Sequence, residues 1–220
     1  LKHRGTLLVT DSLNYDKLYD LGYFFDGGKL YDGKNTLVSD WGEYSPQTRE
    51  AVFNYHVKLT NERFTLTSDT LHYNTLTKIT HIVGPSNINS DGNRIYTERG
   101  YYDTAKDYAE LFDRSVVING KSTMTGDSMY YDKKNGKMHA YNNIVYNDKG
   151  NKNLLTGDYC EYDDTTGYAM ATKNAVVRDY SSPDTLFMHA DTFKIFTYNI
   201  RTDSVYRLVH GYHKARAFRS

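Results

Sequence analysis

Hydrophobic and polar residues alternate along most of this chain, and one alternating phrase recurs with a period of about 29 residues. The phrase has an apolar residue, two spacers, an acid, a spacer, an apolar or small residue, a spacer, and usually Tyr. In the copy at Leu66–Tyr73, Asp69, Leu71 and Tyr73 share one face of an extended chain. Alternation with a period of two predicts a β-strand with one covered face.

The acid of each phrase marks the repeat. Its position rises from 11 to 127 in four steps of 29, and two further copies follow after small insertions. A fixed period of this length indicates an array of one supersecondary unit, so we expect about seven repeats. The repeated acids are Asp11, Asp40, Asp69, Glu98, Asp127, Asp158 and Asp191.

Each period also contains a second extended half, which a polar turn joins to the first. Residues 53–59 alternate in the same way, and residues 132–136 are an example of the turn, with its Asp, Asn and Gly. No segment shows an apolar stripe with a 3.6-residue period. The sequence therefore predicts an all-β fold of roughly fourteen strands with almost no helix.

Stacking of the repeats would bring equivalent residues into rows between two sheets. One row runs from Leu13 through Cys160 to Phe193, and its neighbour consists mostly of Tyr. Two interpretations stay open: the rows form the dry core of a repeat protein, or part of the interior is an open apolar groove. The candidate groove residues are Leu13, Tyr15, Tyr44, Leu71, Tyr73, Tyr102, Met129, Tyr131, Tyr162, Phe193 and Ile195.

Composition narrows the classes of function. The 220 residues carry 27 basic and 27 acidic side chains, which argues against a nucleic-acid binder and against a polybasic membrane anchor. The 22 tyrosines suit half-exposed strands. With Cys160 alone, an intramolecular disulfide and a Cys-rich metal site are excluded. No run of roughly 18 apolar residues and no secretory signal is visible.

We expect residues 1–220 to form a single repeat domain, because the period runs nearly from end to end. The chain starts at Leu1 without Met and stops at Ser220 inside an apolar-basic stretch. These features predict a fragment of a longer protein.

The repeated acids could indicate catalysis or calcium binding, but each lies in the same local setting. Acid–base catalysis needs two groups with different environments, so we expect these acids to bond nearby backbone amides or hydroxyls. His210 and His213 would need a third ligand to bind a metal. No catalytic motif is present, and the sequence predicts no enzyme activity, no cofactor and no metal site.

The recurring phrase resembles the OstA-like (LptA/OstA) family of periplasmic lipopolysaccharide-transport proteins. The resemblance is clearest at Leu66–Asn74 and Met124–Asp132, with Gly136–Val145 similar to the second strand of the family, and it covers nearly the whole chain. It implies an elongated, twisted, boat-shaped β-jellyroll of two antiparallel sheets. It also implies that an apolar interior shelters lipid acyl chains, that molecules join end to end through strand edges, and that no cofactor is used.

We therefore expect a non-enzymatic module that binds and transports lipopolysaccharide, as part of a periplasmic bridge to the outer membrane. Expected partners are lipopolysaccharide or a related lipid, other OstA-like proteins and further copies of the chain, but no nucleic acid. The alternative is a structural or adhesive β-solenoid with a dry core and an outer face that binds glycan or protein. A carbohydrate-active enzyme would need clustered acids that break the repeat, and the sequence has none.

Overall fold

The computed structural model describes residues 1–90, 92–199 and 204–220. Within these ranges the regular elements are nineteen β-strands and no helix, so the all-β prediction is confirmed. The chain divides into two compact units, Leu1–Asp107 (unit 1) and Tyr108–Ser220 (unit 2). The strands outnumber the roughly fourteen expected because the first 44 residues form seven short strands. The number of repeats and the single domain stay predictions.

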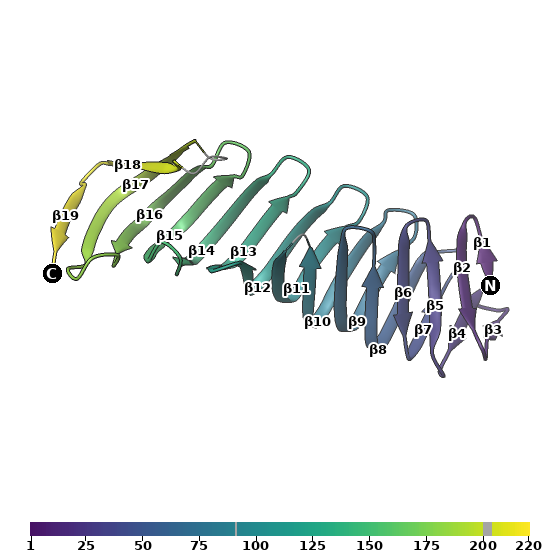
Figure 1. Cartoon of the computed structure of the whole chain (residues 1–220). Helices are drawn as coiled ribbons and strands as arrows, with labels where there is room; N and C mark the ends of the chain where they lie inside the picture. The colour runs from purple at the N-terminus through teal and green to yellow at the C-terminus, as the bar shows by residue number, and fades with distance from the viewer. Residues whose placement is uncertain (91, 200–203) are drawn as a thin grey trace. The chain divides into compact units, whose positions relative to one another are not determined.

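Unit 1 is built from short strands followed by long ones, all antiparallel (Figure 1). The strands are β1 (Lys2–His3), β2 (Thr6–Thr10), β3 (Asn14–Asp16), β4 (Leu21–Phe24), β5 (Gly28–Asp32), β6 (Asn35–Ser39), β7 (Trp41–Tyr44), β8 (Glu50–Thr60), β9 (Phe64–Asn74), β10 (Ile79–Ser90) and β11 (Asn93–Asp103).

Pairing sorts these strands into two sheets. β2, β5 and β6 belong to the first sheet and continue onto the second half of β8. β4 and β7 belong to the second sheet and continue onto the first half of β8. Each long strand, β8 to β11, thus contributes one half to each sheet, which is the arrangement of a β-jellyroll.

Unit 2 continues the long strands, and Figure 1 shows β13 to β17 side by side. Its two sheets form in the same way, with β18 beside the second half of β17 and β19 beside the first half. The strands are β12 (Tyr108–Asn119), β13 (Ser122–Asp132), β14 (Lys137–Asp148), β15 (Asn153–Asp163), β16 (Tyr168–Asp179), β17 (Leu186–Tyr198), β18 (Tyr206–Tyr212) and β19 (Arg216–Arg219).

A β-bulge lets one strand belong to two sheets. The register of β14 shifts between Tyr141 and Ile144, and the two intervening residues, Asn142 and Asn143, have φ of 57° and 51°. Two consecutive left-handed residues bend the strand sharply, so the chain leaves one sheet and enters the other. The same pair of left-handed residues occurs in β8, β12 and β16, at residues 55–56, 113–114 and 173–174. In β10 the register shifts at residues 84–85, and of these two Gly84 alone has a positive φ.

Three of the repeated acids lie opposite these corners and bond to them. The carboxylates of Asp40, Asp127 and Asp158 each bond the residue sixteen positions later, at 2.6, 2.7 and 2.9 Å. The partners are side chains, His56, Asn143 and Asn174, whereas the sequence had indicated backbone amides and hydroxyls. Sequence reasoning missed them because they lie on the next strand.

The residue before each acid differs between the units. In unit 1 it is a buried Ser39, Ser68 or Thr97, whose hydroxyl donates to the carbonyl oxygen two residues further on at 2.7 to 3.0 Å. In unit 2 the same position holds Gly126 or Gly157. The hydroxyl braces the corner in unit 1, and glycine leaves the corner in unit 2 without this brace.

The corner predicts opposite effects for two substitutions of Asn174, whose φ is 57°. Asn174→Val should lower the free energy of local opening by about 2 kcal/mol, because a β-branched side chain is strained in this conformation. Asn174→Gly removes the bond to Asp158 but relieves the strain, so we expect a change of only about 0.5 kcal/mol. Hydrogen exchange of the amides in β15 and β16 measures the opening free energy of both variants. Equal effects of the two substitutions would contradict a left-handed backbone at Asn174.

Candidate functional site

The interior of unit 1 is closed by a polar network that we call the latch: Asp32, Asn35, Tyr73, Lys78 and Thr104. We use free edge for the side of each sheet where the strands end, opposite the corners. Asp32 and Asn35 flank the β5–β6 turn at the free edge of the first sheet, and the other three residues lie at the free edge of the second sheet. The Asp32 carboxylate accepts from the Tyr73 hydroxyl at 2.7 Å and from the Lys78 ammonium. The Asn35 amide donates to Tyr73 and Thr104, both at 2.9 Å.

Charge in the latch is buried but compensated. The side chain of Asp32 is 5% exposed and that of Lys78 is 33% exposed. A buried carboxylate is tolerated only when charged and hydrogen-bonding partners surround it. Burial, followed by the hydrogen bond to Asp32, raises the pKa of the Tyr73 hydroxyl well above its ordinary range.

Further contacts close the interior on either side of the latch. The guanidinium of Arg63, on the β8–β9 turn, bonds the Asp107 carboxylate at 2.7 Å, and Asp107 also accepts from Tyr102. The Tyr44 hydroxyl lies 3.3 Å from the Nδ1 of His3 on β1, in the first sheet, and 3.4 Å from the hydroxyl of Thr75. Three Tyr residues of the repeat thus fill the interior with their rings and join the free edges with their hydroxyls.

The predicted groove residues of unit 1 fall into two groups. Tyr44, Leu71 and Tyr73 are at most 1% exposed and Tyr102 is 6% exposed, so they pack in a closed core. Leu13 and Tyr15 are instead 42% and 45% exposed, which departs from the inward position expected for them. Leu13 directly precedes the three-residue strand β3 and packs near Gly22 with Leu1 and Leu8, and Tyr15 is the middle residue of that strand.

In unit 2 the equivalent residues leave the interior accessible. Met129 and Phe193, near the corner, are 1% and 2% exposed. Towards the free edges, Tyr131 and Ile195 are half-buried and Tyr162 is 38% exposed. The exposed fraction therefore rises from the corner to the edge, as expected for a valley between two sheets that do not meet.

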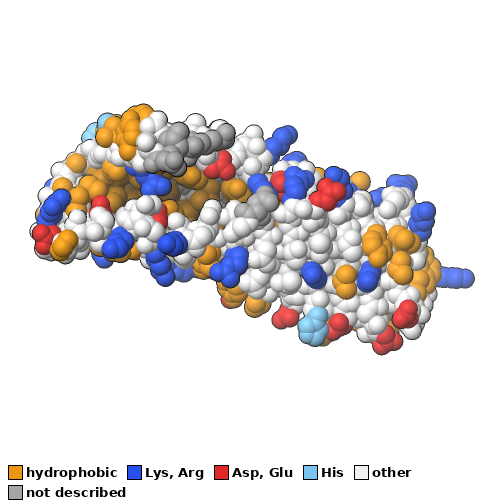
Figure 2. Space-filling view, in the orientation of Figure 1, with side chains coloured by type: hydrophobic (Ala, Val, Ile, Leu, Met, Phe, Trp, Pro, Cys, Tyr) orange, Lys and Arg blue, Asp and Glu red, His pale blue; other side chains and the backbone are white. Residues whose placement is uncertain are grey.

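We call this valley the trough. Figure 2 shows hydrophobic side chains lining a hollow beneath β18, over β14 to β17. Met138 pairs with Tyr131 and Tyr162 in one sheet, and Tyr146 pairs with Leu155 in the other. By strand parity its lining comprises Tyr131, Met138, Tyr146, Leu155, Tyr162, Ala169, Val177, Met188 and Ile195.

The edge of the trough is polar. Asp148 occupies the position of Asp32 four repeats later, and its carboxylate lies 4.0 Å from the guanidinium of Arg207 on β18. Burial alone would raise the pKa of Asp148, but hydrogen bonds from Asn151 and Gly150 and the charge of Arg207 hold it below its ordinary value. The acid is therefore ionised at neutral pH, beside an apolar floor.

Other groups at the site offer little chemistry. Burial raises the pKa of the Cys160 thiol to about 12, so this residue acts as a small core side chain. Across the part of the chain that the structure describes, no group of three or more His, Cys, Asp or Glu side chains could hold a metal ion. No helix in that part is long and apolar enough to span a membrane.

Sequence reasoning found the Tyr positions but missed the residues that decide whether the interior is open. Asp32 and Asn35 resemble ordinary turn residues, and only their distance to Tyr73 reveals the latch. Trough residues Met138 and Tyr146 lie on an even-numbered strand, outside the acid phrase. Their alternation with polar neighbours was a usable signal.

We expect Asp32→Ala to destabilise unit 1 by about 2–3 kcal/mol, because it leaves the Lys78 ammonium and the Tyr73 hydroxyl buried without their acceptor. Urea unfolding followed by the fluorescence of Trp41, the only Trp of the chain, measures unit 1. Glu62→Ala is the control, since it removes an exposed ion pair with Lys34 and should change little. Equal effects of the two substitutions would exclude the latch.

The latch also predicts a dependence on alkaline pH. The pKa of Tyr73 is higher in the folded than in the unfolded chain, so its contribution is complete below the ordinary pKa of about 10 and is lost above it. Tyr73→Phe should lower stability at neutral pH and flatten its decline above pH 10. The Trp41-monitored urea midpoint from pH 8 to 11 tests this, and parallel curves for the two proteins would refute it.

Comparison with known proteins gives one family match and matches among solved structures. Residues 1–69 match the model of OstA-like proteins. One matching structure is LptH from Pseudomonas aeruginosa, described as the LptA-homologous periplasmic component of the lipopolysaccharide transport device. It is 20% identical, with a TM-score of 0.46 over 49% of this chain and 82% of LptH. A search of curated proteins found no match. The first 69 residues are thus similar to OstA-like proteins.

Proposed function

We propose that the trough of unit 2 shelters the acyl chains of lipopolysaccharide or a related lipid, in a non-enzymatic transport module. The observation that carries the proposal is the contrast between the units. The same repeat position is sealed in unit 1, where Tyr73 is fully buried, and accessible in unit 2, where Tyr162 is 38% exposed. An apolar surface left open to water in this way marks a binding site for an apolar ligand.

The lining suits hydrocarbon chains that bind and leave. Covering one CH₂ group stabilises binding by about 0.8 kcal/mol, so a fully enclosed acyl chain of a dozen carbons would dissociate very slowly. An open trough covers only one side of each chain, which lowers the affinity per carbon. Met138 and Met188 add flexible side chains that adapt to chains of different shape.

The polar edge matches the rest of an amphipathic lipid. Asp148 and Arg207 stand at the free edge of the trough, next to Tyr146 and Tyr162. Acyl chains on the floor would leave a polar headgroup at this edge, in contact with water and charged side chains. The orientation follows from the high cost of burying unpaired polar groups.

Location and partners follow from the family resemblance. The OstA-like match of residues 1–69 supports a place in the periplasm and in outer-membrane biogenesis, and a bridge shared with other OstA-like proteins. Every residue of β18 and β19 is exposed, and an unpaired strand edge is a template for another strand. End-to-end pairing with such proteins, or with further copies of this chain, would use edges of this kind.

Site-specific photo-crosslinking tests the proposal. A photoreactive residue at Tyr162 or Ile195, in the trough, should capture lipopolysaccharide in cells or in a purified mixture. The neighbour Lys194 lies on the opposite face of the same strand as Ile195 and is the matched control. We expect at least about fivefold more adduct at the trough positions, since the two faces of a strand meet different surroundings.

Two outcomes would count against the trough. One is equal labelling at the paired positions Ile195 and Lys194, which would indicate nonspecific association. The other is capture only at Leu71 of unit 1, which would move the lipid site to a core that is fully buried in this structure.

A further inference from the structure

The outer face of unit 2 carries a row of aromatic rings that the trough does not use. Phe112, Tyr130, Tyr141 and Tyr159 lie on the successive strands β12 to β15. Their ring centroids are 6.4, 5.6 and 5.2 Å apart in that order. Strand parity places them opposite the trough, because Tyr130 alternates with the inward Met129 and Tyr131.

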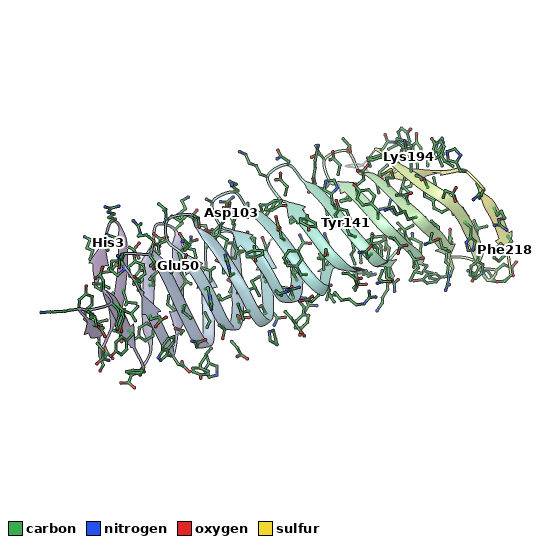
Figure 3. The ribbon with its side chains drawn as sticks, turned by 180° about the vertical axis from the view of Figure 1, so that it is seen from behind. His3, Glu50, Asp103, Tyr141, Lys194 and Phe218 are labelled. Carbon is green, nitrogen blue, oxygen red and sulfur yellow. The ribbon has the colours of Figure 1, made fainter. Side chains whose placement is uncertain are left out.

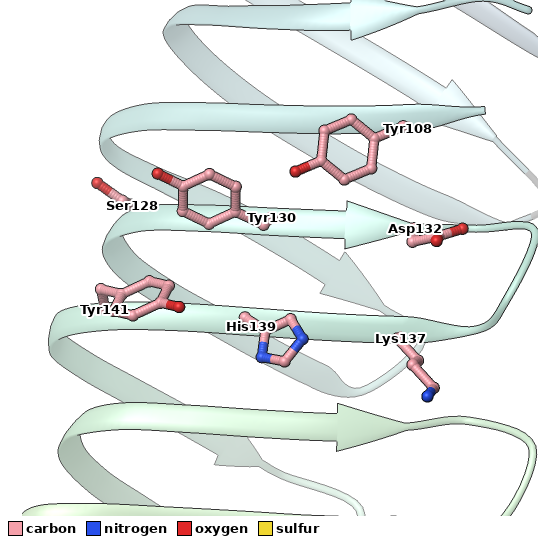
Figure 4. Close-up of a pocket in the computed structure, with 7 residues that line it drawn as sticks. All are labelled: Tyr108, Ser128, Tyr130, Asp132, Lys137, His139 and Tyr141. Carbon is pink, nitrogen blue, oxygen red and sulfur yellow. The ribbon is translucent and has the colours of Figure 1, made fainter. Parts of the chain in front are cut away.

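A hollow of about 480 Å³ lies over this row. Figure 4 shows the rings of Tyr108 and Tyr130 lying flat on neighbouring strands, with Tyr141 turned more nearly edge-on beside them. Figure 3 marks Tyr141 on the same ribbon from behind. The seven residues that line the hollow are Tyr108, Ser128, Tyr130, Asp132, Lys137, His139 and Tyr141.

Polar groups surround the flat rings and balance in charge. Asp132 supplies a carboxylate, whose pKa the hydrogen bonds from Asn135 hold below its usual value, and Lys137 supplies an ammonium. The hydroxyls of Tyr130 and Ser128 both donate and accept. The His139 ring is oriented by a 3.1 Å contact between its Nδ1 and the Tyr159 hydroxyl.

We propose that this hollow binds a neutral glycan chain, with one pyranose ring stacked on the face of Tyr130. The rings of Phe112 and Tyr141 stand at 82° and 85° to that of Tyr130 and flank the stacked sugar. A pyranose has an apolar face of weakly positive C–H groups, which complements the negative face of an aromatic ring. Its rim of hydroxyls needs donors and acceptors mixed within a short distance, as Asp132, Lys137 and His139 provide.

The chemistry of the lining argues against two other ligands. A strongly anionic ligand would meet Asp132 as well as Lys137, so the site has no net positive charge to attract it. None of the seven lining residues is aliphatic, so the hollow offers a protein partner no aliphatic pocket for an anchor side chain.

Binding to an array of neutral oligosaccharides, followed by titration of the strongest member by calorimetry, tests the site with the full chain. We expect Tyr130→Ala to weaken binding about tenfold, because stacking requires the ring, and Tyr130→Phe to keep it within about threefold. Lys137→Ala, at an exposed position, should weaken binding without affecting the fold. The matched control is Tyr31→Ala, an outward Tyr of β5 in unit 1, which should leave affinity unchanged.

The proposal is overturned if no neutral glycan of the array binds, or if Tyr130→Ala and Lys137→Ala bind as the native chain does. Binding of only sulfated or phosphorylated glycans, or of only proteins, would also overturn it. The result is independent of lipid capture, because Tyr162 and Ile195 lie on the opposite face of the sheet.

Discussion

The fold depends on a backbone constraint in the middle of its long strands. Two consecutive residues in the left-handed region, as at Asn142 and Asn143, turn a strand out of one sheet and into the other. Each residue costs about 1–2 kcal/mol in a non-glycine chain, so the surrounding pairs must hold it in place. Ladder bonds on both sides of the corner and the facing acids, such as Asp127, supply that support. Three of the repeated acids, Asp40, Asp127 and Asp158, thus bond directly to a corner.

Once the corner is fixed, the opposite edges determine what the interior does. In unit 1, Asp32 and Tyr73 bring the two free edges together, and the side chains between them are fully buried. In unit 2 the equivalent position holds the Asp148 carboxylate, which lies 4.0 Å from the Arg207 guanidinium. The apolar lining below this pair is accessible. One repeat therefore produces both a sealed core and an open trough. The difference arises from a few polar residues at the edges.

Much of this fold could be predicted from the sequence. The alternation in Leu66–Tyr73 is local, so it identified the strands, the inward face and the Tyr row. The contacts of Asp32 with Tyr73 and of Asp127 with Asn143 join residues 41 and 16 positions apart, and no local pattern encodes them. Leu13 is 42% exposed because it lies between β2 and β3, outside the long strands that carry the row. Lipid binding in the candidate groove stays a prediction, and the part of that groove that is accessible lies in unit 2.

The corners of the two units also differ in stiffness. A hydroxyl such as that of Ser68 ties its own strand to the carbonyl of Thr70, whereas Gly126 and Gly157 carry no such tie. The missing tie lowers the cost of bending at these two positions of unit 2, while at the β12 corner the Ser115 hydroxyl donates to the Phe112 carbonyl at 2.8 Å. In the lipid-binding function proposed above, more compliant walls would let acyl chains of unequal girth share one site.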